Sequence, residues 1–280
     1  MENKAVIGVD LGATKVRAGK IVDGTIISDS YLRISAKAED PFAIINEVIS
    51  SIRAVHDSSI HAIGIGVPSV VDAIAGIVYD VQNIPSWKEV HLKAALEHEF
   101  QLPVSINNDA NCFALGEHRF GLGQSYDNMI GLIIGTGVAG GIIINHQLYV
   151  GHNCGAGEFG MMPYLDHYYE YYCSGQFFER WYHLPGEEVT QLAEKGDQNA
   201  LKIFNEYGRH LGNAIKAILY AYDPACIILG GSVSKSFRFF EVALRQQLNE
   251  FVYPKSIRRL KIEVSRNPDI PVLGAGALCE

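Results

Sequence analysis

The chain has 280 residues and a formal net charge of −8, with 48% hydrophobic and 19% charged residues. This length fits one large domain or two of ordinary size, and the composition is that of a globular protein rather than a disordered one. The acidic balance argues against a general nucleic-acid binder, because neutralising phosphates requires clustered Lys and Arg.

The sequence indicates neither export nor membrane insertion. The first ten residues lack the pattern of a signal peptide. The most apolar stretch, residues 129–144, is shorter than the roughly 20 residues of a spanning helix and contains several glycines. The five cysteines are scattered without a C-x-x-C pair, as is typical of reduced thiols. We therefore expect a cytoplasmic protein without a membrane partner.

The first half predicts a three-stranded meander followed by alternating helices and strands. Short β-prone runs separated by turn residues cover residues 4–9, 16–22 and 25–32. Further along, apolar spacing predicts helices over about 41–56, 90–100 and 110–119, and strands over 60–67, 76–79 and 104–107.

The second half repeats this pattern. The run LIIGTGVAGGIIINHQLYV matches VDLGATKVRAGKIVDGTII, and predicts a second meander over 129–134, 138–144 and 147–150. After a polar, aromatic insertion, residues 151–183, we expect helices over 186–195, 199–222, 237–250 and 272–278, and strands over 226–229 and 260–264.

The repeat predicts an α/β protein of two similar lobes that face each other across a cleft. We place the first lobe at residues 1–112, completed by a C-terminal helix within 266–280. The second lobe is expected at 113–265 and includes the insertion. Both glycine- and threonine-containing turns would then lie in the cleft.

A carboxylate stands at the junction of a strand and a helix in the stretch INNDANCFALG. Asp109 falls at the first turn of the helix, where the helix dipole favours its ionised form. A carboxylate held there can accept a proton from an alcohol. The alternative is that Asn108 or Asp109 merely caps the helix.

The turn between the first two strands contains Asp10, Gly12, Thr14 and Lys15. Such a turn can offer backbone N–H groups to a phosphate while Asp10 holds a hydrated Mg²⁺. An ordinary hairpin is the alternative interpretation.

The corresponding turn of the second meander contains Gly135, Thr136 and Gly137, and spells G-x-G-x-x-G. It is not a dinucleotide-binding fingerprint, because a strand rather than a helix follows the glycines. No G-x-x-x-x-G-K-[ST] sequence is present, which excludes a P-loop. A glycine-rich hairpin can still bring its backbone close to phosphates.

Together with Gly230, Gly231 and Ser232, these motifs resemble the sugar kinase, actin and Hsp70 ATPase superfamily, and more narrowly the ROK family. The resemblance covers essentially the whole chain and is strongest in VDLGATKVRAG, NDANCFALGE, IIGTGVAGGIIINHQLYVG and AGEFG. It implies a two-lobed actin-like ATPase (ribonuclease H-like) fold and the ATP-dependent phosphorylation of a hexose at its 6-hydroxyl. Alternatives are an N-acetylhexosamine kinase and a sugar-sensing regulator without catalytic activity. We also expect a homodimer.

The resemblance also implies roles for individual residues. Asp109 matches the catalytic base, and the sugar ligands match Asn83, Asn108, Glu158 and Glu179. For Asn83, Glu158 and Glu179 the alternative is a solvated loop residue. The residues implied to bind ATP are Asp10, Gly12, Thr14, Lys15, Gly135, Thr136, Gly137, Gly230, Gly231 and Ser232, with Asp10 also holding Mg²⁺ through water.

The sequence departs from the family in its zinc motif. Met161 stands where zinc-bearing members have a His, and Cys173 is the only cysteine in the region that follows. We therefore expect no zinc, which needs about four N or S ligands. Aromatic side chains in residues 164–182 can fix this segment instead, or can serve a subunit interface. The chain begins directly at the first strand, without the DNA-binding segment of the repressor branch, so we expect no nucleic-acid partner.

Overall fold

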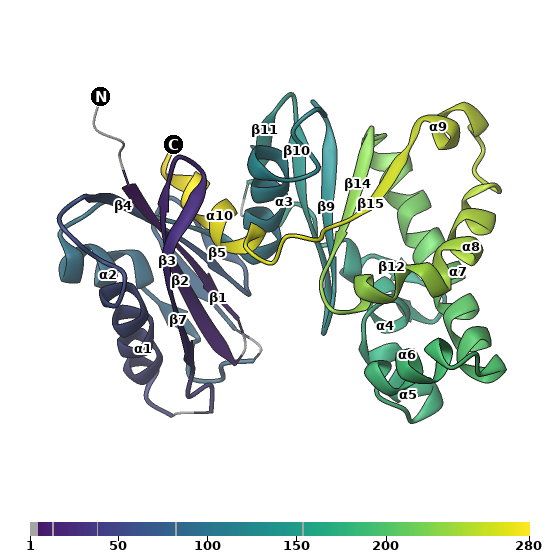
Figure 1. Cartoon of the computed structure of the whole chain (residues 1–280), viewed down its shortest axis with the longest axis horizontal. Helices are drawn as coiled ribbons and strands as arrows, with labels where there is room; N and C mark the ends of the chain where they lie inside the picture. The colour runs from purple at the N-terminus through teal and green to yellow at the C-terminus, as the bar shows by residue number, and fades with distance from the viewer. Residues whose placement is uncertain (1–4, 13, 38, 82, 153) are drawn as a thin grey trace.

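The structure is a computed structural model that describes residues 5–12, 14–37, 39–81, 83–152 and 154–280. Within these residues the chain forms two five-stranded sheets and two smaller ones. The large sheets stand side by side with helices on their outer faces, and two further helices lie between them (Figure 1).

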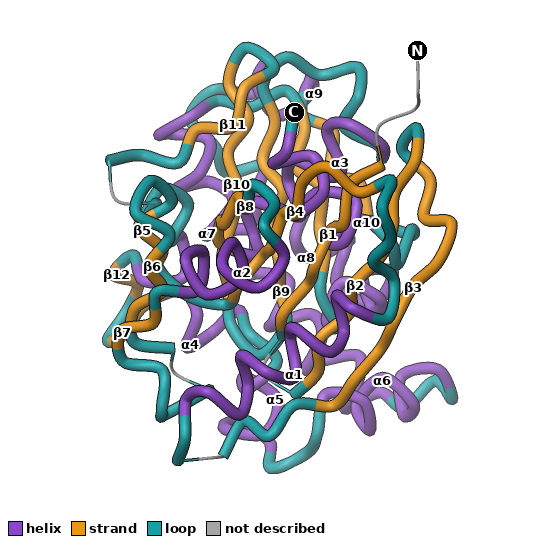
Figure 2. The backbone as a smooth tube through the Cα atoms, turned by 90° about the vertical axis from the view of Figure 1, so that its left-hand side faces the viewer, coloured by secondary structure: helices purple, strands orange, loops and turns teal. Residues whose placement is uncertain are grey.

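The first large sheet has the order β3-β2-β1-β4-β8. Its strands are β1 (Ala5–Leu11), β2 (Lys15–Val22), β3 (Thr25–Arg33), β4 (Ile60–Val67) and β8 (Val104–Asn108). The first three form an antiparallel meander, and β4 and β8 extend the sheet in parallel from β1. Helices α1 (Pro41–Arg53) and α2 (Leu92–Phe100) cover its outer face (Figure 2).

The second large sheet has the equivalent order β11-β10-β9-β14-β15, which confirms the internal repeat. Its strands are β9 (Met129–Ile134), β10 (Val138–Ile144), β11 (Gln147–Tyr149), β14 (Cys226–Gly230) and β15 (Lys261–Val264). Helices α6 (Gly186–Glu194), α7 (Gln198–Tyr222) and α8 (Phe237–Leu248) lie on its outer side, and the short α9 (Pro254–Arg259) was not predicted (Figure 1).

The insertion is more regular than its sequence indicates. It contains η1 (Phe159–Met161), a hairpin of β12 (Pro163–Tyr164) and β13 (His167–Tyr168), and helices α4 (Tyr169–Cys173) and α5 (Gln176–Tyr182). These elements are too short to show a period in the sequence. The same holds for a small sheet beside the first lobe, formed by β5 (Val71–Asp72), β6 (Ile77–Tyr79) and β7 (Glu89–Val90).

Each large sheet has its own hydrophobic core. The first core joins the sheet to buried side chains of α1 such as Ile44 and Val48, and the second joins β9, β10 and β14 to α4–α8. The long helix α7 buries one side, including Phe204 and Leu211, and leaves the other polar. Among the helices of the described residues, none is both long and apolar enough to cross a membrane.

The helices α3 (Asp109–Phe120) and α10 (Ile270–Gly276) cross each other between the two sheets. α3 packs on β9 and β10, whereas α10 returns to β1, β2 and β4 of the first sheet. The crossing is close: a Cβ atom at Gly274 would lie 1.8 Å from the carbonyl oxygen of Cys112. The predicted lobe boundary at residue 112 falls inside α3, and it stays a prediction.

Candidate active site

The helix cap at the start of α3 belongs to Asn108. Its Oδ1 accepts hydrogen bonds from the backbone N–H groups of Ala110 (2.9 Å) and Asn111 (3.4 Å), and its Nδ2 donates to the carbonyl of Ser69 (3.2 Å). The capping interpretation is therefore confirmed for Asn108. Asp109 follows as the first helical residue, and its Oδ1 accepts from the N–H of Ala110 at 2.8 Å.

Three carboxylates from different elements meet at this junction. Burial, followed by the negative charge of Asp10 and then that of Glu158, raises the pKa of Asp109 to about 7. Burial also raises the pKa of Asp10, at the end of β1, although the positive charges of Lys15 and Arg17 oppose the shift. The structure thus brings together three of the predicted site residues, Asp10, Asp109 and Glu158.

The loop that carries Glu158 is fixed against β10 by a glycine. Gly157 has φ +100°, and its carbonyl accepts from the N–H of Gly140 at 2.9 Å. A Cβ atom on Gly157 would lie 1.7 Å from the carbonyl oxygen of Gly140, so a larger residue cannot take this place. This close approach explains the motif AGEFG and places Glu158 at the start of η1.

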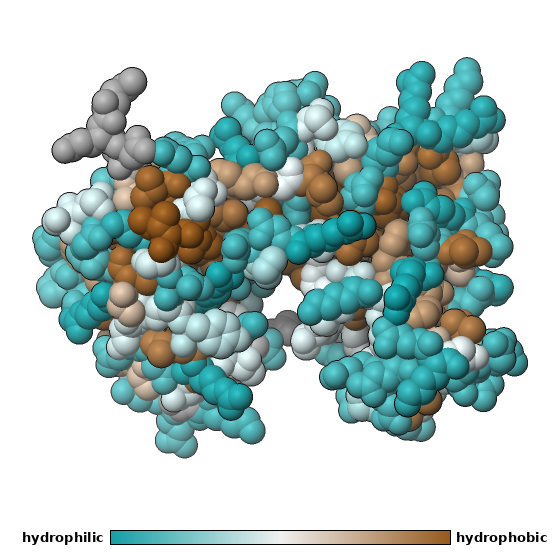
Figure 3. Space-filling model, in the orientation of Figure 1, coloured by the Kyte–Doolittle hydropathy of each residue, from teal (hydrophilic) through white to brown (hydrophobic). Residues whose placement is uncertain are grey.

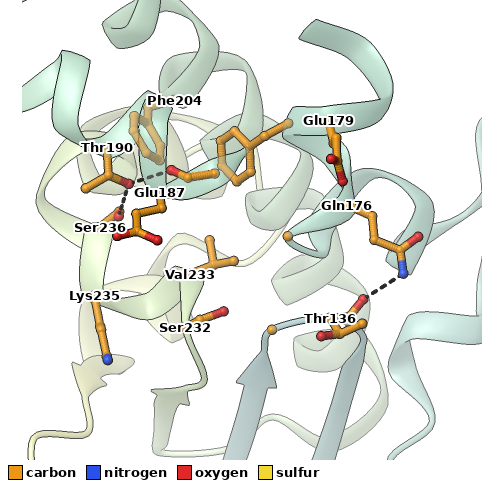
Figure 4. Close-up of a pocket in the computed structure, with 14 residues that line it drawn as sticks. Thr136, Gln176, Glu179, Glu187, Thr190, Phe204, Ser232, Val233, Lys235 and Ser236 are labelled. Carbon is orange, nitrogen blue, oxygen red and sulfur yellow. Dashed lines mark hydrogen bonds between the residues drawn. The ribbon is translucent and has the colours of Figure 1, made fainter. Parts of the chain in front are cut away.

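A separate pocket of about 680 Å³ lies between the β9–β10 turn, α5, α6 and η2 (Val233–Ser236) (Figure 4). Three of the predicted nucleotide residues, Gly135, Thr136 and Ser232, line it. Gly231, with φ +86°, forms the turn after β14, and its carbonyl accepts from Ser234 Oγ at 2.8 Å. The other lining residues include Gln176, Glu179, Glu187, Thr190, Phe204, Lys235 and Ser236.

The remaining nucleotide residues lie in or next to turns of the two large sheets. Gly230 ends β14 against the ring of Phe113, and Gly137 lies in the β9–β10 turn. In the first turn, the N–H of Gly12 donates to the carbonyl of Lys15 at 2.8 Å. Thr14 is exposed between these two residues.

Two predicted sugar ligands are not brought to Asp109. Asn83 is exposed in the turn after β6, and Glu179 lines the pocket with Thr136 and Ser232. Within the part of the chain that the structure describes, no hydrogen bond or ion pair links either residue to Asp109.

Sequence reasoning missed Glu170, in the first turn of α4. Its Oε2 accepts from the N–H of Val138 at 2.8 Å. Burial, followed by the negative charge of Glu170, raises the pKa of Glu158. Glu170, rather than Glu179, is therefore the carboxylate beside Glu158. The sequence contains no signal for this role, because a helix of five residues shows no period.

The side chains of the insertion are poorly placed for zinc. Cys173 is completely buried, which raises the pKa of its thiol, whereas Met161 is 45% exposed. Among the described residues, no group of three or more His, Cys, Asp or Glu side chains is arranged to hold a metal ion. The absence of zinc stays a prediction. A hydrated Mg²⁺ that is shared with phosphates needs only one or two carboxylates, and the hard oxygens of Asp10 fit that requirement.

Comparison with known proteins gives consistent matches. The sequence profile of the ROK family matches residues 6–280. A glucokinase of Streptomyces coelicolor is 30% identical over 262 residues, which is 81% of this chain and 82% of that protein. The xylose repressor of Bacillus subtilis is 27% identical over 297 residues, covering 97% of this chain and 76% of the repressor.

A solved structure supports the same assignment. The ROK family glucokinase of Streptomyces griseus, in complex with glucose and AMPPNP, matches this chain with a TM-score of 0.84 and 27% identity, and 98% of each chain is covered. The family profile matches nearly the whole sequence, and the two large sheets have equivalent strand orders. This chain has the actin-like ATPase fold and belongs to the ROK family.

Proposed function

We propose that the chain is an ATP-dependent sugar kinase that transfers the γ-phosphoryl group of ATP to the 6-hydroxyl of a hexose. The observation that carries the proposal is the environment of Asp109. Burial and the nearby charges of Asp10 and Glu158 raise its pKa to about 7. A general base works best when its pKa is near the operating pH. The glucokinase relatives support the same reaction.

The sugar would lie between the two sheets, with its 6-hydroxyl at Asp109. Glu158 would accept hydrogen bonds from sugar hydroxyls, and Asn108 would donate its remaining amide hydrogen, because its oxygen is used in the cap. Asn83 would reach the sugar from the turn after β6. We assign Glu179 to the nucleotide pocket instead, since it lines that pocket.

ATP would occupy the pocket beside the β9–β10 turn. Gly135, Thr136 and Ser232 would face the nucleotide, and the turn after Asp10 would approach the phosphates from the first lobe. Asp10 would hold Mg²⁺ through water, and the ion would balance charge on the phosphoryl group. Positioning of the two substrates would account for most of the rate.

A sugar-sensing regulator is the second candidate, because the xylose repressor aligns with 97% of the chain. A regulator that only binds sugar has no use for a base at Asp109 or a metal-binding carboxylate at Asp10. Both side chains are present, and the negative charge of Asp10 is close enough to help raise the pKa of Asp109. This arrangement favours the kinase.

A substrate panel tests the proposal. Hexoses and N-acetylhexosamines would be assayed with ATP and Mg²⁺ for ADP release, and phosphorus NMR would identify the phosphorylated position. We expect one sugar class to give ADP together with a 6-phosphate. Sugar binding without ADP release from any member of the panel would favour the regulator.

A further inference from the structure

The turn between β9 and β10 is held by the segment that follows the hairpin of β12 and β13. This segment, residues 169–182, comprises α4 and α5, and we call it the clamp. The N–H of Gly175 donates to the carbonyl of Gly135 at 2.6 Å. Gln176 Nε2 donates to the carbonyl of Thr136 at 3.1 Å (Figure 4). The backbone of the turn is therefore fixed at successive residues.

A third contact comes from the other end of the clamp. Glu170 Oε2 accepts from the N–H of Val138 at 2.8 Å, and this approach depends on Gly137. A Cβ atom at residue 137 would lie 2.7 Å from the same oxygen. The charge of Glu170 also acts on Glu158. The clamp also contacts the segment that follows Glu158: the N–H of Tyr169 donates to the carbonyl of Met162 at 3.0 Å, and a Cβ atom at Gly160 would lie 3.2 Å from Cβ of Glu170. One segment thus contacts both the nucleotide turn and the turn that begins at the predicted sugar ligand Glu158.

Arg180 ties the two helices of the clamp together. Its Nη1 donates to the carbonyl of Tyr171 at 2.7 Å, and its Nη2 donates to Gln176 Oε1 at 2.9 Å. The guanidinium lies 3.9 Å from the centre of the Tyr171 ring, and His167 also stacks on that ring, at 3.8 Å between centroids. Because Arg180 holds the oxygen of Gln176, it orients the amide nitrogen toward Thr136 (Figure 4).

We propose that Arg180 is a positioning residue that couples sugar binding to nucleotide binding by holding the clamp against the β9–β10 turn. The inference rests on the proposed function. A sugar bound at Glu158 would order the α4 end of the clamp and, through the clamp, the β9–β10 turn. The second ligand would then meet a site that is already arranged. By linkage, each ligand raises the affinity for the other by the same factor.

The test is the substitution Arg180→Met, with Arg238→Met as a matched control. Arg238 also covers an aromatic ring, Phe239, at 4.6 Å and pairs with Glu194, but it belongs to α8 and not to the clamp. AMPPNP binding would be measured by calorimetry with and without the sugar that is most active in the panel. Thermal midpoints of all variants would be compared to detect a general loss of folding.

We expect sugar to tighten AMPPNP binding in the unmodified chain and in Arg238→Met. In Arg180→Met we expect this factor to approach one and the AMPPNP affinity to fall about three- to tenfold, as for the loss of one or two modest hydrogen bonds. The KM for ATP should rise more than kcat falls. Gln176→Leu, at an exposed position, should reproduce the loss if Arg180→Met folds poorly.

Two results would overturn the coupling role. One is a coupling factor of one in the unmodified chain, and the other is an unchanged factor in Arg180→Met or Gln176→Leu. If the unmodified chain phosphorylates a sugar and Arg180→Met behaves like Arg238→Met, only this inference is wrong. If the unmodified chain binds neither AMPPNP nor any sugar, the proposed function and this inference are both wrong.

Discussion

Asp109 occupies a place where an ionised carboxylate is costly. It is partly buried, and two further carboxylates, Asp10 and Glu158, act on it from neighbouring elements. Structural ion pairs usually lower the pKa of a carboxyl group, whereas this arrangement raises it. A site that keeps such a group at the expense of stability is typical of catalysis.

Replacing Asp109 with Asn should separate the two roles of the position. Asn keeps the hydrogen-bonding shape but cannot accept the proton, so kcat should fall by about 10²–10⁴. Sugar affinity should stay within about tenfold, because Asn108 and Glu158 are untouched. Steady-state kinetics and calorimetry on the same preparation would measure both. Near-normal turnover would mean that Asp109 serves the helix terminus alone.

The raised pKa of Asp109 also predicts a dependence of stability on pH. Between about pH 4, the ordinary carboxyl pKa, and pH 7, the native state holds a proton that the unfolded state has lost. The unfolding free energy contributed by this group therefore falls as the pH rises through that window. Asn does not ionise, so the unfolding free energy of Asp109→Asn should not fall in this window. The variant should therefore be more stable than the unmodified chain at pH 8, with a smaller difference at pH 5. Urea unfolding of both proteins at the two pH values would measure it, and equal differences would contradict the prediction.

Asp10 should influence both the metal and the base. In Asp10→Asn the negative charge beside Asp109 is lost, so the pKa of Asp109 should fall. The acidic limb of kcat/KM against pH would then move to lower pH, while the Mg²⁺ concentration needed for half-maximal rate would rise. Sugar binding should change little. An unmoved limb, or an equal loss of sugar binding, would argue against this placement of Asp10.

At the scale of elements, aromatic side chains pack the insertion together. Tyr164 stacks on Tyr169 with 4.4 Å between ring centroids, Tyr172 stacks on Trp181, and the hydroxyl of Tyr207 donates to the carbonyl of Cys173 at 2.5 Å. This aromatic packing holds β12, β13, α4 and α5 together. Such contacts each add modestly to burial, and here they are numerous.

Elemental analysis of the purified protein should therefore find no stoichiometric zinc. A strong chelator should leave activity intact once Mg²⁺ is restored, because Cys173 is buried and His167 is stacked on Tyr171. The control is a zinc-bearing ROK kinase treated in parallel, which should lose activity. One zinc per chain that is removed together with activity would contradict the prediction.

The elements that the sequence predicts well are those with long, regular patterns. Residues 60–67, 129–134 and 138–144 coincide with β4, β9 and β10, because each is a continuous apolar run ended by turn residues. The two helices of the clamp were missed, since five and seven residues show no reliable period. Because these helices were not predicted, the sequence could not indicate that Glu170 rather than Glu179 lies beside Glu158. The sequence could single out Asp109 as a candidate because a strand, a cap and a carboxylate are adjacent in the chain. Contacts between residues far apart in the chain leave no such pattern.

At the scale of the whole molecule, the site depends on two halves that each hold part of it. Asp10 and Asp109 lie at the ends of β1 and β8 of the first sheet, whereas Glu158 and the pocket of about 680 Å³ belong to the second. The space-filling view is hollowed between the halves on the side away from the crossing helices (Figure 3). Movement of the halves about α3 and α10 would bring the two turns together. The predicted homodimer and cytoplasmic location stay predictions.

The return of α10 to the first sheet also sets the order in which the chain can fold during synthesis. The sheet that is made first lacks its inner cover until α10 leaves the ribosome, because Gly8 and Gly64 lie directly under that helix. The second sheet is complete once β15 has been made. The half that is translated first should therefore become protease-resistant last, and until then it presents an uncovered apolar face to chaperones.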